Sequence, residues 1–292
     1  MKYLSWLFVI LAFLLASVNS SKPKYQKVSV IIPAFNEENT VARVVEVIKQ
    51  ASCVDEIIVV DDGSSDNTAQ EAREAGATVI SHDVNKGKGE ALYTGYKNAE
   101  CDIIAFIDAD IHNLTSKKVS AMIKPILDGK TDITKTKFSR ASGRVTELTA
   151  KPLLGFFFPE INYEQPLSGQ FAARKEALKK INFEKDYGVD VGIVIDADVL
   201  GISIMEVDIG AIQHDMSSLS DLNMMANEVV RTIISRANKY GRVIMIDDIG
   251  HFIRMSIVGL SLVILGLFTI FFVTPSKIYI CSFISTVFSC CI

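Results

Sequence analysis

Cysteine is scarce in this sequence, and its arrangement excludes two common uses. Of the five cysteines in 292 residues, Cys53 and Cys101 lie outside the C-terminal tail, and neither belongs to a CxxC pair or a cluster of cysteine and histidine. A disulfide-stabilised secreted scaffold and a structural zinc site both need such clusters. We therefore expect neither thiol chemistry nor zinc binding.

Excess positive charge is also missing. The chain has 30 Lys and Arg against 34 Asp and Glu, a net charge of −4 and a pI near 5.7. Proteins that bind nucleic acids generally present a basic surface, so we expect no nucleic-acid partner. With 17 glycines, 7 prolines and 49% hydrophobic residues, the composition excludes collagen-like and disordered chains. The length allows one large domain or two small ones.

Hydrophobic residues are concentrated at the two ends and raise the mean hydropathy to +0.29. Residues 3–18 are almost entirely apolar, which is typical of a signal peptide or a short membrane anchor. The run 255–273 has 19 residues without a charge, close to the ~20 that cross a bilayer. We expect an N-terminal anchor or signal segment in residues 1–21 and a transmembrane helix or hairpin in residues 252–292. A buried core helix is the alternative for 255–273.

Positive residues beside the apolar ends predict an orientation in the membrane. Lysines follow the first apolar segment and arginines precede the second: Lys22, Lys24, Lys27, Arg242 and Arg254. Because positive residues accumulate on the cytoplasmic side, we expect residues 22–254 to face the cytoplasm. A cleaved signal peptide would instead place them outside.

Between the two ends, short apolar strands alternate with amphipathic helices. The expected strands are 27–32, 56–60, 77–81 and 102–107, and the expected helices are 40–50, 66–75 and 90–99. This alternation predicts a parallel sheet covered by helices, in which ligands bind beyond the carboxyl ends of the strands. Further on, we expect strands at 131–138, 165–173 and 203–209, and helices at 143–158, interrupted at Pro152, and at 220–240. We interpret residues 25–245 as one domain.

Acidic residues close two of the expected strands. Asp108 and Asp110 end the fourth strand, where residues two apart project to the same side. Two carboxylates there suit Mg²⁺ or Mn²⁺ held against substrate phosphates, and the alternative is a polar strand exit that caps the next helix. Asp61 and Asp62 end the second strand, before a glycine turn and a helix cap at Asp66. Two carboxylates exceed what a turn needs, and they could accept hydrogen bonds from a ribose or a base.

Three further features suit anions or a metal. Residues 85–90, Asn-Lys-Gly-Lys-Gly-Glu, form a basic glycine loop that opens a helix and suits a diphosphate, although the loop is not a Walker A motif. Arg144, in Gly143-Arg-Val-Thr146, also precedes a helix and suits a phosphate, with a surface arginine as the alternative. His214 could complete a metal site beside the two aspartates, although a lone histidine is usually structural.

The order of these motifs carries a resemblance that no single motif does. The four segments are 28–38 (VSVIIPAFNEE), 59–66 (VVDDGSSD), 85–89 (NKGKG) and 108–110 (DAD). Over residues 26–112 the sequence resembles family 2-type glycosyltransferases of GT-A fold. Over residues 130–236 it is similar to glucosyl-3-phosphoglycerate synthases and their mannosyl relatives. The second similarity is carried by residues 143–148, 151–154, 158–160, 165–170 and 187–192, with Val207, Asp208 and His214.

The resemblance implies an α/β, Rossmann-like GT-A domain with a mostly parallel sheet, which we expect to be flanked by N- and C-terminal membrane helices. Residues expected at the nucleotide are Pro33, Ala34, Phe35, Glu37, Asp61, Asp62, Lys88 and Asp108, with Lys88 at its phosphates. The expected metal ligands are Asp108, Asp110 and His214. Residues expected at the acceptor phosphate are Gly143, Arg144 and Thr146, and those at the sugar are Leu167, Ser168, Gly169 and Asp190. The residues expected in catalysis are Asp110, Lys88 and Asp190. Asp190 stands where the family usually has a glutamate, so its carboxylate is one methylene shorter.

We therefore expect a metal-dependent hexosyltransferase in the membrane, with Mg²⁺ or Mn²⁺ as cofactor. The resemblance implies transfer from UDP- or GDP-hexose to a small phosphorylated acceptor such as 3-phosphoglycerate, with retention of anomeric configuration. The alternative is a polyprenyl- or dolichyl-phosphate hexosyltransferase, which the apolar tail favours, whereas residues 143–146 and 187–192 favour the small acceptor. A non-catalytic nucleotide-sugar-binding protein is disfavoured by the intact Asp108 and Asp110. A homodimer is compatible with either activity.

Overall fold

The structure, a computed structural model, describes residues 26–137, 143–214, 218–242 and 244–272. The chain divides into two compact units, of which the first ends at Arg236 and the second begins at Ala237. The domain predicted over residues 25–245 therefore extends slightly beyond the first unit.

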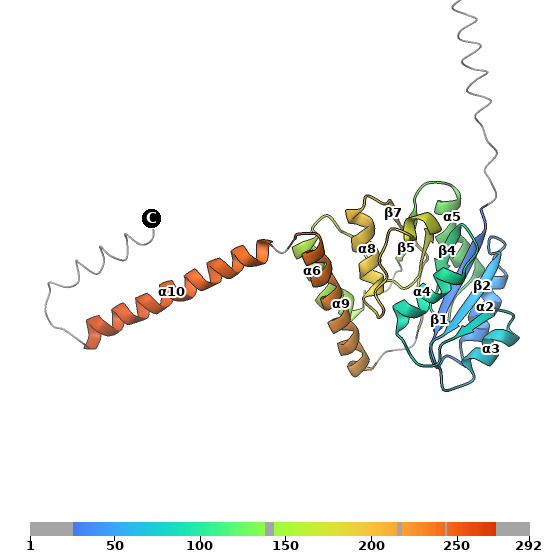
Figure 1. The fold of residues 1–292 in the computed structure, drawn as a ribbon, viewed down its shortest axis with the longest axis horizontal. Helices are drawn as coiled ribbons and strands as arrows, with labels where there is room; N and C mark the ends of the chain where they lie inside the picture. The colour runs from blue at the N-terminus through green and yellow to red at the C-terminus, as the bar shows by residue number, and fades with distance from the viewer. Residues whose placement is uncertain (1–25, 138–142, 215–217, 243, 273–292) are drawn as a thin grey trace, which may run out of the picture. The chain divides into compact units, whose positions relative to one another are not determined.

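The described part of the first unit is built on one seven-stranded sheet with the order β3-β2-β1-β4-β6-β5-β7 (Figure 1). Its strands are β1 (Val28–Ala34), β2 (Glu56–Asp61), β3 (Thr78–Ser81), β4 (Ile103–Phe106), β5 (Ile133–Lys137), β6 (Phe171–Arg174) and β7 (Ile204–Asp208). β6 runs antiparallel to both β4 and β5, and the other neighbouring strands are parallel. The prediction of an α/β fold with a mostly parallel sheet is confirmed.

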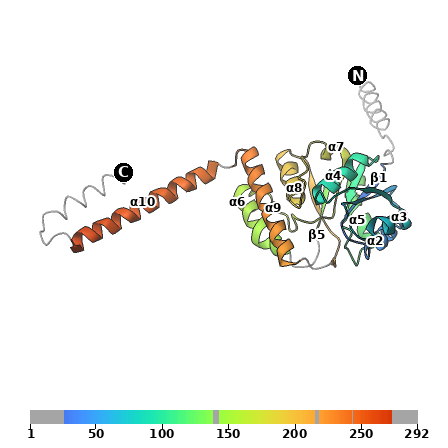
Figure 2. The ribbon, with the colours of Figure 1, turned by 60° about the horizontal axis from the view of Figure 1, so that its bottom comes forward.

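Helices cover both faces of this sheet (Figures 1 and 2). On one face lie α2 (Val41–Lys49), α3 (Thr68–Glu74) and α5 (Ser116–Leu127), and on the other lie α4 (Lys88–Asn98), α7 (Lys175–Leu178) and α8 (Val189–Val199). Successive strand residues point to opposite faces, so Val30 and Ile32 of β1 join one apolar cluster while Ile31 joins the other. β1 is mostly apolar because both of its faces are covered, and its one polar residue, Ser29, is buried and hydrogen-bonded to Glu56.

The remaining helices of the first unit come after β5 and after β7 in the sequence. They are a π-helical turn (Thr146–Ala150), which continues directly into α6 (Lys151–Phe157), and α9 (Leu219–Lys239). Pro152 does not interrupt a helix as predicted. It is the second residue of α6, and the helical segment runs through it from the π-helical turn without a break.

The carboxyl ends of three neighbouring strands meet at one edge of the sheet. Ala34 of β1 pairs in register with Asp61 of β2, and Ile31 pairs with Phe106 of β4. The segments that leave these strands carry most of the acidic and basic residues singled out from the sequence. This edge is therefore where the predicted site residues can converge.

The second unit contains α10 (Ile244–Phe272). Among the described residues no helix is long and apolar enough to cross a membrane. Over the described residues, the prediction of flanking membrane helices is therefore wrong, and so is the membrane localisation that rested on it. The parts of that prediction that fall on residues 1–21 and 273–292 lie outside the described residues.

Candidate functional site

A lysine held between two aspartates forms the centre of the candidate site. Lys88 is the first residue of α4, Asp108 follows β4, and Asp190 lies in the first turn of α8. The Lys88 Nζ lies 2.9 Å from Asp108 Oδ1 and 3.2 Å from Asp190 Oδ2. Burial alone would lower the pKa of Lys88, but the carboxylates of Asp108 and Asp190 outweigh it and raise that pKa above its usual value. Lys88 is therefore a fixed positive charge at the edge of the sheet.

Asp190 is buried deeply and only partly satisfied. Its side chain is 5% exposed, and burial raises its pKa although Lys88 and Lys135 oppose this shift. Oδ2 faces Lys88, but Oδ1 has no hydrogen-bond partner. A buried carboxylate oxygen without a donor is costly in a folded protein, so Oδ1 is an acceptor available to a ligand.

The segment before β6 shapes the other side of this cluster. A side chain at Gly169 would place its Cβ 2.2 Å from Asp108 Oδ2 and 2.6 Å from Lys88 Nζ, so it would displace the paired Asp108 and Lys88 side chains. Gln170 donates a hydrogen bond from Nε2 to Asp108 Oδ2 over 2.7 Å. The hydroxyl of buried Ser168 lies 2.7 Å from that of Thr136 on β5. Leu167 beside them is partly buried. Three of the four residues predicted at the sugar, Ser168, Gly169 and Asp190, are thus buried, and Gly169 and Asp190 both adjoin Lys88.

Asp110 carries a carboxylate whose charge is poorly compensated. Burial, and next the nearby Asp108 carboxylate, raise the pKa of Asp110 to about 6, while His214 opposes the shift. Among the described residues no three His, Cys, Asp or Glu side chains are grouped to hold a metal ion. Asp108 already contacts Lys88 and Gln170. The three predicted metal ligands therefore do not form a complete site by themselves.

The same donor set nevertheless fits a divalent cation that is shared with a substrate. Mg²⁺ is usually bound through one or two carboxylates together with substrate phosphates, rather than by a cage of protein ligands. Asp110 offers an oxygen ligand of this kind, and His214 lies close enough to influence its pKa. A cation would also add positive charge beside Asp110, whose pKa the Asp108 carboxylate raises.

Asp62 anchors the loop directly before Lys88. It is 3% exposed, and its oxygens accept hydrogen bonds from the backbone N–H groups of Lys86 (2.9 Å) and Gly87 (2.8 Å). His82 Nδ1 lies 2.6 Å from Asp62 Oδ1, and His82 Nε2 lies 2.9 Å from Thr94 Oγ1 on α4. Asp62 was predicted to lie at the nucleotide. In the structure its carboxylate contacts Lys86, Gly87 and His82 of the protein itself. The sequence contained no signal for His82, because its partners are distant along the chain.

The segment after β1 forms the remaining part of the edge. Phe35 is 46% exposed at the end of β1, and the neighbouring Asn36 has a φ of 57°. Asn36 accepts a hydrogen bond from Ser65 N (2.9 Å), which joins this turn to the loop after β2. In that loop Asp61 Oδ1 accepts a hydrogen bond from Ser64 N (3.0 Å). An exposed aromatic ring at a strand end suits stacking with a planar base.

The predicted acceptor residues lie at the start of the π-helical turn. Gly143 and Arg144 are exposed, whereas Thr146 is buried. Glu147 N donates to Gly143 O over 3.1 Å, so the chain already turns as a helix here. The preceding residues 138–142 lie outside the described residues.

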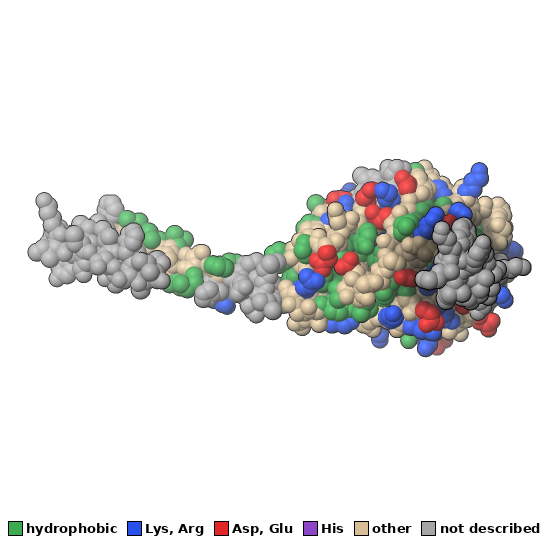
Figure 3. Space-filling model, turned by 90° about the horizontal axis from the view of Figure 1, so that it is seen from above, with side chains coloured by type: hydrophobic (Ala, Val, Ile, Leu, Met, Phe, Trp, Pro, Cys, Tyr) green, Lys and Arg blue, Asp and Glu red, His purple; other side chains and the backbone are tan. Residues whose placement is uncertain are grey.

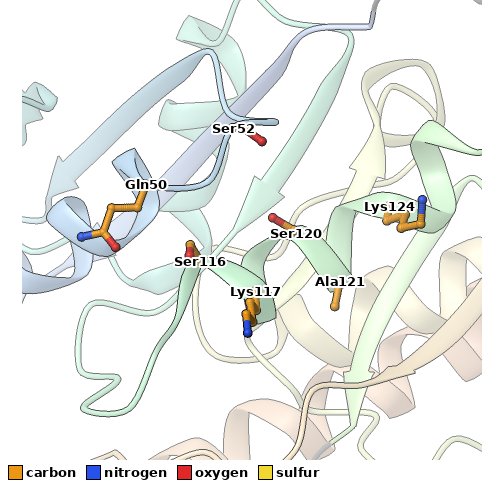
Figure 4. Close-up of a pocket in the computed structure, with 7 residues that line it drawn as sticks. All are labelled: Gln50, Ser52, Ser116, Lys117, Ser120, Ala121 and Lys124. Carbon is orange, nitrogen blue, oxygen red and sulfur yellow. The ribbon is translucent and has the colours of Figure 1, made fainter.

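Two surface hollows lie apart from this cluster. A hollow of about 360 Å³ between the end of α2 and the side of α5 is lined by Gln50, Ser52, Ser116, Lys117, Ser120, Ala121 and Lys124 (Figure 4). None of the predicted site residues lines it. The second hollow, which lies over α4 and includes Tyr93 and Tyr96, contains only Gly89 and Glu90 of the predicted glycine loop. On the face shown in Figure 3, acidic and basic side chains are interspersed over the first unit. The edge with Lys88 therefore remains the candidate site.

Comparison with known proteins agrees with this geometry. The family model described as "Glycosyl transferase family 2" matches residues 29–187. The chain belongs to glycosyl transferase family 2. The predicted hexosyltransferase of GT-A fold is thereby confirmed.

Individual relatives of this family member are more specific. The glucosyl-3-phosphoglycerate synthase of Mycobacterium tuberculosis H37Rv is 37% identical over 236 residues, covering 72% of this chain and 73% of the relative. The synthase of Petrotoga mobilis is 35% identical over 247 residues, covering 74% and 75%. A crystal structure of the M. tuberculosis enzyme in complex with Mn²⁺, UDP-glucose and phosphoglyceric acid has 38% sequence identity and a TM-score of 0.69, and covers 73% of this chain and 80% of that one.

Proposed function

We propose that this glycosyltransferase moves a glucosyl group from UDP-glucose to 3-phosphoglycerate and releases UDP. The observation that supports the proposal most strongly is the Lys88–Asp108–Asp190 cluster, in a chain 37% identical to a glucosyl-3-phosphoglycerate synthase. The related enzyme from M. tuberculosis has been crystallised with Mn²⁺, UDP-glucose and phosphoglyceric acid.

The donor end of the site uses the edge formed by β1, β2 and β4. Phe35 would stack on the uracil, with Pro33, Ala34, Glu37 and Asp61 around the nucleoside. Lys88 would neutralise the diphosphate as the bond to the sugar breaks, which is where negative charge develops. Asp62 would act indirectly, by holding the Lys86–Gly87 turn in place.

A divalent cation would be held by Asp110 and His214, with Asp108 close by and diphosphate oxygens completing the ligand set. Bound there, it would stabilise the negative charge of the leaving UDP. The raised pKa of Asp110 supports this assignment, because a carboxylate crowded by another carboxylate gains most from a nearby cation.

The acceptor end uses the start of the π-helical turn. Arg144 is exposed and can bind a phosphate through two parallel hydrogen bonds, with Gly143 and Thr146 beside it. Leu167, Ser168 and Gly169 would border the hexose, and the open Oδ1 of Asp190 would accept a hydrogen bond from one of its hydroxyls. The resemblance implies retention of configuration at the anomeric carbon. A homodimer stays a prediction, which light scattering of the purified protein checks.

A direct comparison of acceptors tests the proposal. The purified chain, UDP-[¹⁴C]glucose and Mn²⁺ are incubated with either 3-phosphoglycerate or a polyprenyl phosphate in detergent, and the products are separated by charge and by organic extraction. We expect label only in the water-soluble acidic product. Label in the organic phase, with none in the acidic product, would transfer the assignment to the lipid acceptor.

A further inference from the structure

Lys135 is an unusual residue in the interior of the first unit. It lies in the middle of β5, and its residue exposure is 0%. Lysine is almost never fully buried unless it is paired, because removing an ammonium group from water is costly. The proposed reaction gives no role to this residue, so its burial needs a separate explanation.

The Lys135 ammonium group is directed at Asp190. Its Nζ lies 3.9 Å from Asp190 Oδ1 and donates to the main-chain oxygen of Asp190 over 3.4 Å. The Phe171 ring lies beneath it, with the ring centroid 4.9 Å from Nζ. Burial lowers the pKa of Lys135 to about 8, and the Asp190 carboxylate opposes this shift. Lys135 therefore remains charged at neutral pH.

Lys88 and Lys135 lie on two sides of one carboxylate. Lys88 donates a hydrogen bond to Asp190 Oδ2, whereas Lys135 lies near Oδ1 but beyond hydrogen-bond distance. Oδ1 is therefore near the positive charge of Lys135 but has no hydrogen-bond donor. This arrangement places positive charge on both sides of the buried Asp190 carboxylate while Oδ1 stays open to a ligand.

We propose that Lys135 is a positioning residue for hexose recognition. Its ammonium group holds Asp190 by a hydrogen bond to the Asp190 main chain and by attraction to the carboxylate, and it leaves Oδ1 open to a hydroxyl of the donor sugar. The inference rests on the proposed function in one respect, which is that Asp190 contacts the hexose. Lys135 itself touches neither substrate. Its effect on the hexose is transmitted through Asp190, which it contacts directly, whereas Lys88 also contacts Asp108.

Comparing UDP with UDP-glucose tests this effect, because only UDP-glucose carries the hexose that Asp190 would contact. In Lys135→Met the side chain keeps its approximate length and loses its charge. By calorimetry we expect UDP-glucose to bind about tenfold or more weakly, as for the loss of one hydrogen bond to a charged group, and UDP to bind within about twofold of wild type. Lys137→Met on the same strand is the matched control. Lys137 is partly exposed and pairs with Glu164, so both affinities should stay unchanged.

A second variant keeps the inference testable if Lys135→Met unfolds. The double variant Lys135→Met/Asp190→Asn removes both charges and should bind UDP-glucose as Asp190→Asn does, because Lys135 acts only through Asp190. A further tenfold loss in the double variant overturns the inference, and so does an equal loss of UDP and UDP-glucose binding in Lys135→Met. Glucose transfer to 3-phosphoglycerate by the wild type is measured separately. Its absence overturns the proposed function, while the positioning role is still decided by the ratio of the two affinities.

Discussion

Replacing Asp62 tests whether this carboxylate holds the Lys88 loop or contacts the nucleotide. Asp62 accepts two backbone hydrogen bonds, from Lys86 and Gly87, and a third contact from His82. Hydrogen bonds to a charged group contribute about 1.5–3 kcal/mol each, and the exposed Lys86 N–H regains a bond to water in the variant. We therefore expect Asp62→Ala to lower the free energy of unfolding by about 2–4 kcal/mol.

The same change should also lower activity, because Lys88 follows Gly87 directly. Loss of the loop's anchor displaces the lysine, and a misplacement of about 1 Å can reduce the rate about 100-fold. Urea unfolding and kcat/KM at a temperature well below the Tm separate the two effects. Asp55→Ala is the matched control, since Asp55 accepts a backbone hydrogen bond from Val28 N (2.9 Å) at the other end of β2. It should leave kcat/KM unchanged. An Asp62→Ala protein with wild-type stability and weakened UDP binding would refute the anchoring role.

Three further changes test other parts of the account. Arg144→Ala should raise the KM for 3-phosphoglycerate about 10- to 150-fold, from the loss of about 1.5–3 kcal/mol, and leave the KM for UDP-glucose nearly unchanged; equal changes in both would contradict a phosphate contact. Because the pKa of Asp110 is raised in the folded state, to about 6, the metal-free protein should lose stability as the pH rises from about 4 to about 6. Asp110→Asn should remove this pH dependence of stability and raise the Tm in EDTA at pH 7. It should also abolish activity and the Tm increase caused by Mn²⁺. An unchanged Tm response to Mn²⁺ would exclude Asp110 as a ligand. Arg236→Ala should lower the free energy of unfolding in urea by about 3–5 kcal/mol, because Arg236 forms a buried ion pair with Asp196 over 2.8 Å. Arg231 is exposed, so Arg231→Ala should lower it by less than about 1 kcal/mol. Similar losses in the two variants would show that burial of the pair is unimportant.

The strands of the sheet were predictable because burial on both faces leaves a clear sequence pattern. The strands Val28–Ala34, Glu56–Asp61 and Ile103–Phe106 each have an apolar centre, and each is followed by a polar loop. The helix α8 was not predicted. Nine of its eleven residues are buried, and β-branched residues fill it, so no polar face marks it as a helix. The helix α5 was also missed, although Thr115 caps it by accepting a hydrogen bond from Lys118 N.

The candidate site was predictable only where it follows the strand ends. The sequence placed Asp108 after a strand and Lys88 in a loop before a helix, and both lie at the carboxyl edge. The contact between Lys88 and Asp190 joins residues 102 positions apart, and only the resemblance pointed to Asp190. Lys135 resembles any charged residue of a strand until its burial is seen. Long-range contacts, and the burial of a single charged side chain, are properties of packing that local sequence patterns do not encode.

The product formed from UDP-glucose and 3-phosphoglycerate tests the central claim most directly. The purified full-length chain is incubated with both substrates and Mn²⁺, and the anomeric region of the ¹H NMR spectrum is followed over time. The account predicts that the UDP-glucose signal declines while a new α-anomeric signal appears, in a product with the mass of glucosyl-3-phosphoglycerate. An unchanged spectrum, or free glucose as the sole product, would contradict it.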